Sequence, residues 1–399
     1  MIPAPTAASR AFHALEGARR HLADRDPATL DSQVALAEIP APTGQEEARA
    51  RQVALALGAL SLETAVDCAG NVVALRPGTR GGGAVVVCAH MDTVFADGTA
   101  LRMQREWGAG RITGPGIGDN ARGLAGMLAI AGALHAAGVR TQRPILFAAT
   151  TGEEGEGDLR GARQLFAGAA AGAWAAIALD GAGDERVVTH ALGIRRLRLR
   201  VTGPGGHSWA SFGVANALHA AAGIAAELAS WRLPTAPRSA LTVSRMAGGT
   251  AINAIPGDAW LEVDVRSSSS AELDRLEREI RIAARRCVEG ENARRRAGSP
   301  PLQLTVDLIG DRPAGVVSGD AFIAQAAFDA TRLIGRTPEG AIASTDANIP
   351  LSLGIPAIAL GAGGDGGDTH TVREWFENRD GSAGLARAMT VLVAAAGVA

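Results

Sequence analysis

The sequence predicts an α/β protein in which a mostly parallel sheet flanked by helices is interrupted by a smaller inserted domain of the ferredoxin-like βαββαβ type. Continuous apolar runs, typical of strands buried on both faces, alternate with helical segments up to about residue 180 and again after 310. Between these parts, from about residue 193, the strands alternate apolar and charged residues instead. The length of 399 residues, with 47% hydrophobic and 20% charged residues, fits more than one domain.

The larger part begins with two segments of helical spacing and then alternates strands with helices. Its clearest strand is AVVVCA at 84–89, a continuous apolar run. Further strands are expected at 72–75, 145–149, 175–179 and 357–360. Helices are expected at 28–38, 45–60, 121–138, 159–166, 319–334 and 381–397.

The inserted part starts with RRLRLRV at 195–201, whose period of two is that of a half-exposed strand. It continues as helix, strand, strand, helix and strand at 213–231, 240–246, 259–266, 271–294 and 302–308. This order is the ferredoxin-like arrangement. We therefore expect one domain made of 1–192 and 310–399, with a second domain inserted at 193–309.

Composition excludes several classes of function. The chain contains no lysine, so all 39 basic residues are arginines, and Schiff-base chemistry, pyridoxal-phosphate anchoring and the lysine-containing phosphate loop are excluded. A net charge of −2 and the lack of a long apolar segment argue against nucleic-acid and membrane partners. Three widely separated cysteines, Cys68, Cys88 and Cys287, indicate reduced thiols and favour a cytoplasmic location.

Acidic and histidine side chains gather at the ends of predicted strands and in one glycine-rich loop. They are His90, Asp92, Asp119, Glu153, Glu154, Asp180 and His370. Because the carboxyl ends of parallel strands meet at one edge of a sheet, we expect these side chains to converge. Divalent metals such as zinc, cobalt or manganese require carboxylates and imidazoles around one point. A single strand-end aspartate more often caps a turn, so the prediction rests on the whole set.

The motifs HMD (90–92), GDN (118–120) and GEEG (152–155), together with Asp180 and His370, resemble those of a zinc exopeptidase and deacylase family. That family includes carboxypeptidase G, peptidase T, acetylornithine deacetylase and succinyl-diaminopimelate desuccinylase. The resemblance covers nearly the whole chain, including the inserted domain. The peptidase T-like and carboxypeptidase-like branches are the most similar, because of GPGGHS (203–208), NAIP (253–256) and STDAN (344–348).

The resemblance implies that the chain binds two divalent metal ions, zinc in the first place, with cobalt or manganese as alternatives. One ion would be held by His90, Asp119 and Asp180, and the other by Glu154, His370 and the shared Asp119. A carboxylate has two oxygens, so one aspartate can bridge two cations about 3.5–4 Å apart. In the family the peptide bond after the bridging aspartate is cis, which here is the bond from Asp119 to Asn120.

The resemblance also assigns the catalytic groups. Glu153, adjacent to a ligand, would act as general base, taking a proton from a water that bridges the metals and delivering it to the leaving amine. Asp92 would accept a hydrogen bond from the imidazole of His90 and fix the orientation of the ring.

The inserted domain would supply contacts to the substrate. In this family His207 polarises the scissile carbonyl and stabilises the oxyanion, commonly from the partner subunit of a dimer. Arg266 would bind a substrate carboxylate, and Asn253 would belong to the same substrate-binding set. We expect a homodimer formed through this domain, with 195–201 as an edge strand and the alanine-rich helix 215–229 as a contact surface.

The predicted function is hydrolysis of an amide or peptide bond in short peptides or N-acyl amino acids that bear a free carboxylate. A dedicated deacylase or desuccinylase of one amino-acid metabolite is the alternative among enzymes. A metal-free binding or scaffold relative is a third interpretation, and the presence of Glu153 and every proposed ligand argues against it. The sequence does not separate the first two, because loops build the substrate pocket.

Overall fold

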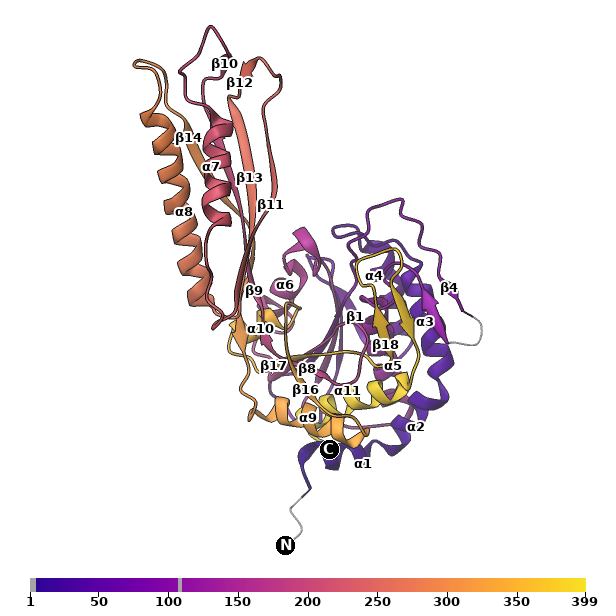
Figure 1. Cartoon of the computed structure of the whole chain (residues 1–399). Helices are drawn as coiled ribbons and strands as arrows, with labels where there is room; N and C mark the ends of the chain where they lie inside the picture. The colour runs from indigo at the N-terminus through magenta and orange to yellow at the C-terminus, as the bar shows by residue number, and fades with distance from the viewer. Residues whose placement is uncertain (1–4, 107–109) are drawn as a thin grey trace. The chain divides into compact units, whose positions relative to one another are not determined.

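The computed structural model describes residues 5–106 and 110–399, which fold into two compact units (Figure 1). The first unit combines the chain up to Ala191 with Val316–Ala399, and the second is Leu192–Gly315. The second unit ends later than the expected insert 193–309, because its last strand does not stop at Leu308. A bulge between Leu308 and Gly310 lets the pairing continue to Arg312, opposite Ile194.

The first unit is built on a nine-stranded sheet whose central strands are parallel. Strands β6, β3, β7 and β17 lie side by side in this order and run the same way, as the continuous apolar runs predict. β2 runs antiparallel to β6 on one side, and β8 runs antiparallel to β17 on the other. The strands are β1 (Glu63–Val66), β2 (Val72–Arg76), β3 (Val85–His90), β6 (Ile145–Thr150), β7 (Ala175–Leu179), β8 (Arg186–Ala191), β15 (Gly315–Val316), β16 (Glu339–Ala343) and β17 (Ala357–Leu360).

The sequence pattern did not predict β8 and β16. β16 is only partly buried, so it lacks a continuous apolar run, and β8 ends just before the pattern of the inserted part begins. The antiparallel direction of β8 is important for the site, because it places the first residue of β8 at the edge where the parallel strands end.

Helices cover the sheet and bury its apolar residues. α5 contacts β3, β6 and β7, α9 contacts β8 and β17, and α11 contacts β3. Figure 1 shows these three helices gathered on one side of the sheet, with α1 and α2 packed against them. The helices of this unit are α1 (Ala7–Ala14), α2 (Glu16–Asp24), α3 (Asp26–Ala37), α4 (Glu47–Gly58), α5 (Ala121–Ala136), α6 (Arg160–Ala167), α9 (Phe322–Leu333), α10 (Asn348–Ser352) and α11 (Gly381–Ala396), together with the short 3₁₀ turn Gly155–Gly157.

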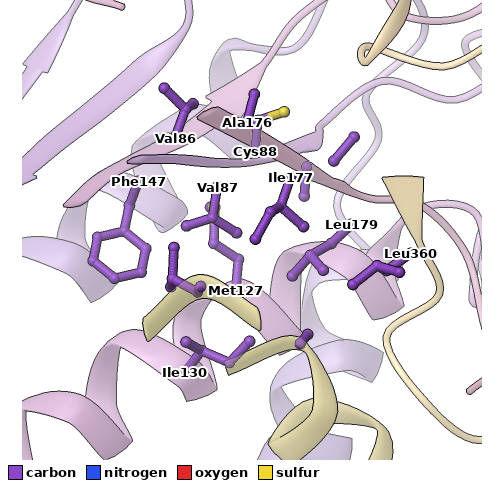
Figure 2. Close-up of a cluster of buried hydrophobic side chains, with 14 of the residues drawn as sticks. Val86, Val87, Cys88, Met127, Ile130, Phe147, Ala176, Ile177, Leu179 and Leu360 are labelled. Atoms are coloured by element: carbon purple, nitrogen blue, oxygen red, sulfur yellow. The ribbon is translucent and has the colours of Figure 1, made fainter. Parts of the chain in front are cut away.

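Figure 2 shows the apolar core between the central strands and α5. Val87 of β3, Phe147 of β6 and Ile177 of β7 face Met127 and Ile130 of α5, and all five are fully buried. Cys88 is buried in the same strand, and burial raises the pKa of its thiol well above the ordinary value. Cys88 is therefore a small apolar residue of the core, as the sequence indicates, and not a nucleophile beside His90.

A small antiparallel sheet brings two distant loops of the first unit together. Its order is β18-β19-β5-β4, and its strands are β4 (Gln104–Arg105), β5 (Arg111–Thr113), β18 (Asp365–Gly367) and β19 (Trp375–Glu377). β5 leads into the glycine-rich loop that carries Asp119, and His370 lies in the turn between β18 and β19. The pairing of β5 with β19 thus places these two loops next to each other.

The second unit has the βαββαβ order of the ferredoxin-like arrangement and an antiparallel sheet in the order β11-β13-β9-β14. Two helices bury apolar residues such as Leu197 and Leu199 against it. Arg196 and Arg198, which alternate with these leucines along β9, pair with acids of β13. Its elements are β9 (Gly193–Thr202), α7 (Ala217–Ala229), β11 (Ser239–Gly248), β13 (Asp258–Ser267), α8 (Ser270–Ala293) and β14 (Gln303–Arg312), with a short ribbon of β10 (Gly206–His207) and β12 (Ala254–Ile255).

Two details of this unit differ from the sequence interpretation. The segment 195–201 is not an edge strand: β9 pairs with β13 on one side and β14 on the other, so the sheet edges are β11 and β14. α7 begins at Ala217 rather than 213, because the side chain of Asn216 accepts hydrogen bonds from the amides of Leu218 and His219, at 2.9 and 3.2 Å, and caps the helix.

Within residues 5–106 and 110–399, no helix combines the length and hydropathy needed to cross a membrane.

A close backbone approach between α11 and the loop after β17 can be tested with a pair of glycine substitutions. A Cβ added at Gly384 would lie 2.2 Å from the Cα of Gly363, so we expect Gly384→Ala to lower the free energy of unfolding by about 1–3 kcal/mol. Gly132, within α5, has no atom within 4 Å of an added Cβ, and Gly132→Ala should instead stabilise by up to about 1 kcal/mol. Urea unfolding measures both, and equal effects of the two changes would contradict the packing constraint.

Candidate metal centre

Three predicted ligands from three different segments meet at the carboxyl edge of the central strands. His90 ends β3, Asp119 lies in the loop before α5, and Glu154 follows β6. One ligand atom of each lies within 4.8 Å of the others, close enough to share a metal ion. The convergence follows from the fold, because β3 and β6 are adjacent parallel strands that end at the same edge.

His90 is held in a fixed orientation by its two ring nitrogens. Nδ1 lies 3.1 Å from the backbone carbonyl oxygen of Asp92, and Nε2 lies 3.0 Å from Oδ1 of Asp119. The carboxylate of Asp92, expected to orient the ring, is farther away at 3.6 Å, so the carbonyl is the closer acceptor. With Nδ1–H donating to this carbonyl, Nε2 is the atom directed at the site.

Asp119 lies between two imidazoles, one at each carboxylate oxygen. Oδ1 faces Nε2 of His90 at 3.0 Å, and Oδ2 faces Nε2 of His370 at 3.2 Å. The same nitrogen of His370 lies 2.9 Å from Oε1 of Glu154. This arrangement is the one that a carboxylate shared between two cation sites requires, with His90 on one side and His370 with Glu154 on the other.

Asp180, at the end of β7, adds another carboxylate to this edge. Burial and the charge of nearby Asp119 raise the pKa of Asp180 to about 7, and the charges of Glu154 and Asp346 act in the same direction. The pKa of His370 shifts in the same direction: hydrogen bonds with Asp119 and Glu154 raise it to about 10. The centre thus gathers more negative charge than its own side chains can neutralise without bound protons.

These observations fit a divalent metal centre. Both ring nitrogens of His90 face acceptors, yet a neutral imidazole has a single N–H, so the contact between Nε2 and Asp119 calls for either a second proton on the ring or a metal ion between the two atoms. Metal ions compete with protons for such groups, and carboxylate with imidazole is a donor set that zinc, cobalt and manganese accept. The residues that would hold the ions are His90, Asp119, Glu154, Asp180 and His370.

Asp92 positions the two glutamates that follow β6. Its Oδ1 accepts a hydrogen bond from the amide of Glu153 at 2.9 Å, and its Oδ2 accepts from the amide of Glu154 at 3.0 Å and from the hydroxyl of Thr43 at 2.7 Å. The nearby imidazole of His90 and the hydrogen bonds from Thr43 and Glu154 outweigh the effect of burial and hold the pKa of Asp92 at about 2. Asp92 therefore fixes the backbone from which Glu153 and Glu154, both buried, project.

Asn120 connects the Asp119 loop to the neighbouring strand end. Its side-chain amide donates to the carbonyl of Leu179 at 2.8 Å, and its Oδ1 accepts from the amides of Gly181 and Gly123 at 3.0 and 3.1 Å. These contacts place the backbone on both sides of Asp180 against the start of α5. The peptide bond between Asp119 and Asn120 is cis, as expected from the resemblance.

Glu374 is a site residue that the sequence analysis missed. It is 1% exposed, and its carboxylate accepts hydrogen bonds from the amides of Gly118 and Asp119, both at 2.7 Å, and of Gly116 at 3.1 Å. Burial, opposed by these backbone donors, raises the pKa of Glu374 to about 7. Glu374 thus ties the loop that carries Asp119 to the loop that carries His370. The one feature of the sequence that could have indicated this residue is its position four residues after the predicted ligand His370.

The second unit brings two of the three predicted substrate residues together. His207 pairs with Ala254 in the β10–β12 ribbon, and the amide of Ser208 donates to the carbonyl of Asn253 at 2.9 Å. Nδ1 of the exposed His207 accepts from the amides of Trp209 and Ala210, at 3.2 and 3.4 Å, so the neutral ring carries its proton on Nε2.

Arg266 lies at the other end of the second unit. It precedes the last residue of β13, whereas the ribbon with His207 adjoins the first. The eight residue steps from Asp258 to Arg266 span about 26 Å of extended strand. Its guanidinium is half exposed and donates to Oδ1 of Asp264 at 2.7 Å. His207 and Arg266 of one unit therefore cannot contact the same small molecule.

Comparison with known families identifies the chain. Residues 86–396 match the model of peptidase family M20/M25/M40, a span of the chain that contains every predicted ligand. The chain belongs to this family. The resemblance found in the sequence is thereby confirmed, and M20 proteins are metal-dependent hydrolases, in agreement with the donor set described above.

Solved structures of other M20-like proteins share the fold across nearly their whole length. Aminopeptidase PepT from Bacillus cereus is 21% identical, with 92% of this chain and 98% of that chain covered and a TM-score of 0.74. A tripeptidase from Staphylococcus aureus has the same identity and coverage and a TM-score of 0.76. A Bacillus subtilis protein described as a dinuclear metal-binding M20 peptidase is 16% identical, with 92% and 97% covered and a TM-score of 0.67. No curated protein matches the sequence significantly.

Because the carboxylate of Glu374 holds the loop that carries Asp119, its removal should lower the affinity for metal. Glu374→Ala would leave three buried amides unpaired, and we expect metal binding about 10- to 100-fold weaker together with a lower melting temperature of the metal-free protein. Glu374→Gln keeps one acceptor oxygen and should lie between wild type and Glu374→Ala. Titration calorimetry with zinc measures the affinity. Glu377→Ala, which removes a partly exposed carboxylate 3.9 Å from Arg111, is the control, and an equal effect there would refute the role of Glu374.

Proposed function

We propose that this M20 protein is a two-metal hydrolase that cleaves the amide bond of short peptides or N-acyl amino acids bearing a free carboxylate. The observation that carries the proposal is the carboxylate of Asp119 between His90 and His370, with Glu154 beside it and Glu153 next in the chain. The Bacillus subtilis neighbour described as a dinuclear metal-binding peptidase supports it.

The proposed ligand sets divide the centre into two halves. His90 and Asp180 would hold one zinc ion, Glu154 and His370 the other, and Asp119 would contribute one oxygen to each. When bound, the ions would polarise the scissile carbonyl and acidify a water molecule, so that hydroxide forms near neutral pH.

Glu153 would act as the general base. Its backbone amide is fixed by Asp92, and the side chain is buried beside the ligand Glu154, so its carboxylate is held near the reacting atoms. It would accept a proton from the attacking water and deliver it to the nitrogen of the leaving amine, which closes the proton balance of amide hydrolysis.

The second unit would complete the site in a homodimer. Nε2–H of His207 is an exposed donor suited to an oxyanion, and the half-exposed guanidinium of Arg266 is suited to a substrate carboxylate. Because these two groups lie at opposite ends of β13, which spans about 26 Å from Asp258 to Arg266, one small substrate would take them from two copies of the chain. Trp209 and Phe212, 87% and 80% exposed near His207, are apolar groups that such a contact would cover. The three free cysteines support a cytoplasmic location for this enzyme.

Exchange of the two adjacent glutamates should separate proton transfer from metal binding. Glu153→Gln should keep two metal ions but lower kcat by about 10²–10⁴-fold, because the base is lost and the ligands remain. Glu154→Gln should instead release metal. Metal content by elemental analysis, together with turnover of a dipeptide and N-acyl-amino-acid library followed by mass spectrometry, measures both. A near wild-type kcat in Glu153→Gln would show that another group is the base.

Subunit complementation tests whether His207 serves the partner's metal centre. Glu153→Gln and His207→Ala proteins should each be inactive, but a mixed dimer would contain one site with both groups intact. Random exchange makes half of the dimers mixed, so we expect recovery of about a quarter of wild-type activity. Mass spectrometry of the intact dimers verifies exchange. If activity stays at the level of the single variants after exchange, His207 does not act across a dimer.

A further inference from the structure

We infer that the cavity beside the metal centre binds an acidic group of the substrate through Arg186. This inference rests on the proposed hydrolase function and narrows its substrate class. The preferred substrate would carry, besides the carboxylate assigned to Arg266, a second carboxylate in the side chain or the acyl group that enters this cavity.

The cavity lies entirely within the first unit and is continuous with the metal centre. Its volume is about 380 Å³, and Asp119 and Asp180 form part of its wall. This volume suffices for an amino-acid side chain or a short dicarboxylic acyl group. Val188 and Leu360 supply apolar wall against which methylene groups can pack.

The direction of β8 brings Arg186 to this cavity. β8 runs antiparallel to β17, with Leu360 opposite Val187, so Arg186, the first residue of β8, lies beside the end of β17. The carboxyl end of β7, which carries Asp180, is at the same edge, because β7 and β17 are parallel. A parallel strand at this position would have placed its first residue at the opposite edge of the sheet.

Arg186 is the cation available to a ligand there. Among the described residues that line the cavity it is the sole cationic side chain, it is exposed, and it makes no ion pair within the described chain. The neighbouring acids are engaged elsewhere: Asp365 pairs with Arg379, Asp184 with Arg336, and Glu374 with three backbone amides.

The chemistry of this wall favours a carboxylate. A guanidinium offers parallel N–H donors that match the two oxygens of a carboxylate. Thr345 adds a hydroxyl to the lining, and its Oγ1 accepts from the amide of Ala347, so its own proton can be donated to a ligand. Metal ions held by Asp119 and Asp180 would offset the negative charge that these two carboxylates present to an anion in the cavity. A neutral or basic group would leave the guanidinium without a partner.

Matched acid and amide substrates test this inference. Metal-loaded protein is offered dipeptides with glutamate or glutamine at either position, and N-succinyl-alanine against its succinamoyl analogue. Wild type should cleave the acid of a pair with a kcat/KM about 10- to 100-fold above that of the amide, mainly through KM. Arg186→Gln should lose this preference while still cleaving the amide. Arg373→Gln, an exposed charge change outside the cavity lining, should retain it.

Calorimetry with glutarate and glutaramate separates the two hypotheses. Both ligands can place one carboxylate at the metals, so they differ only at the other end, which is a carboxylate in glutarate and an amide in glutaramate. The inference is supported if wild type binds glutarate more tightly than glutaramate and Arg186→Gln does not. Wild-type turnover without acid preference, or a preference that survives in Arg186→Gln, would overturn it while leaving the hydrolase intact. If wild type cleaves nothing in the library, the proposed function fails. In that case calorimetry still tests Arg186, and equal affinity of wild type and Arg186→Gln for glutarate would overturn its role as well.

Discussion

The constraint on which the site depends is the burial of several carboxylates at one sheet edge. Asp119, Glu154 and Asp180 repel one another there, and burial together with this repulsion raises the pKa of Asp180. Two imidazoles offset part of the charge in the absence of any other cation, which explains the raised pKa of His370. Divalent ions would neutralise the cluster more completely than protons, and for this reason the arrangement is a binding site rather than a stabilising network.

Such a cluster keeps its geometry only if the surrounding backbone holds it. Three side chains do so through main-chain amides and carbonyls: Asp92 fixes the two glutamates, Asn120 fixes the start of α5 to the end of β7, and Glu374 fixes the loop of Asp119. Each is fully buried, so its hydrogen bonds are not exchanged with water. The ligands therefore project from a rigid frame even though most of them lie on loops.

The division into two units assigns different tasks to different surfaces. The first unit contains the metal centre and the cavity with Arg186, and the second presents His207 and Arg266 at opposite ends of one long strand. In the proposed function, reaction chemistry and recognition of one substrate carboxylate would therefore be built on separate scaffolds. The length of β13 favours a shared site, because a strand of that length keeps its two ends too far apart for one small molecule.

The sequence by itself determined the central strands, most helices, the βαββαβ insert and the family, because apolar periodicity and the spacing of strand-end motifs are local properties. It also indicated that the candidate ligands would cluster, since parallel strands bring their ends together. The tertiary structure decided what depends on pairing between distant segments. β9 is a central strand because β14 pairs with its second edge. The carboxylate of Asp92 accepts hydrogen bonds from the amides of Glu153 and Glu154, and that of Glu374 accepts one from the amide of Asp119. The antiparallel direction of β8, which places Arg186 at the cavity, is likewise set by partners far along the chain and by no pattern within the strand.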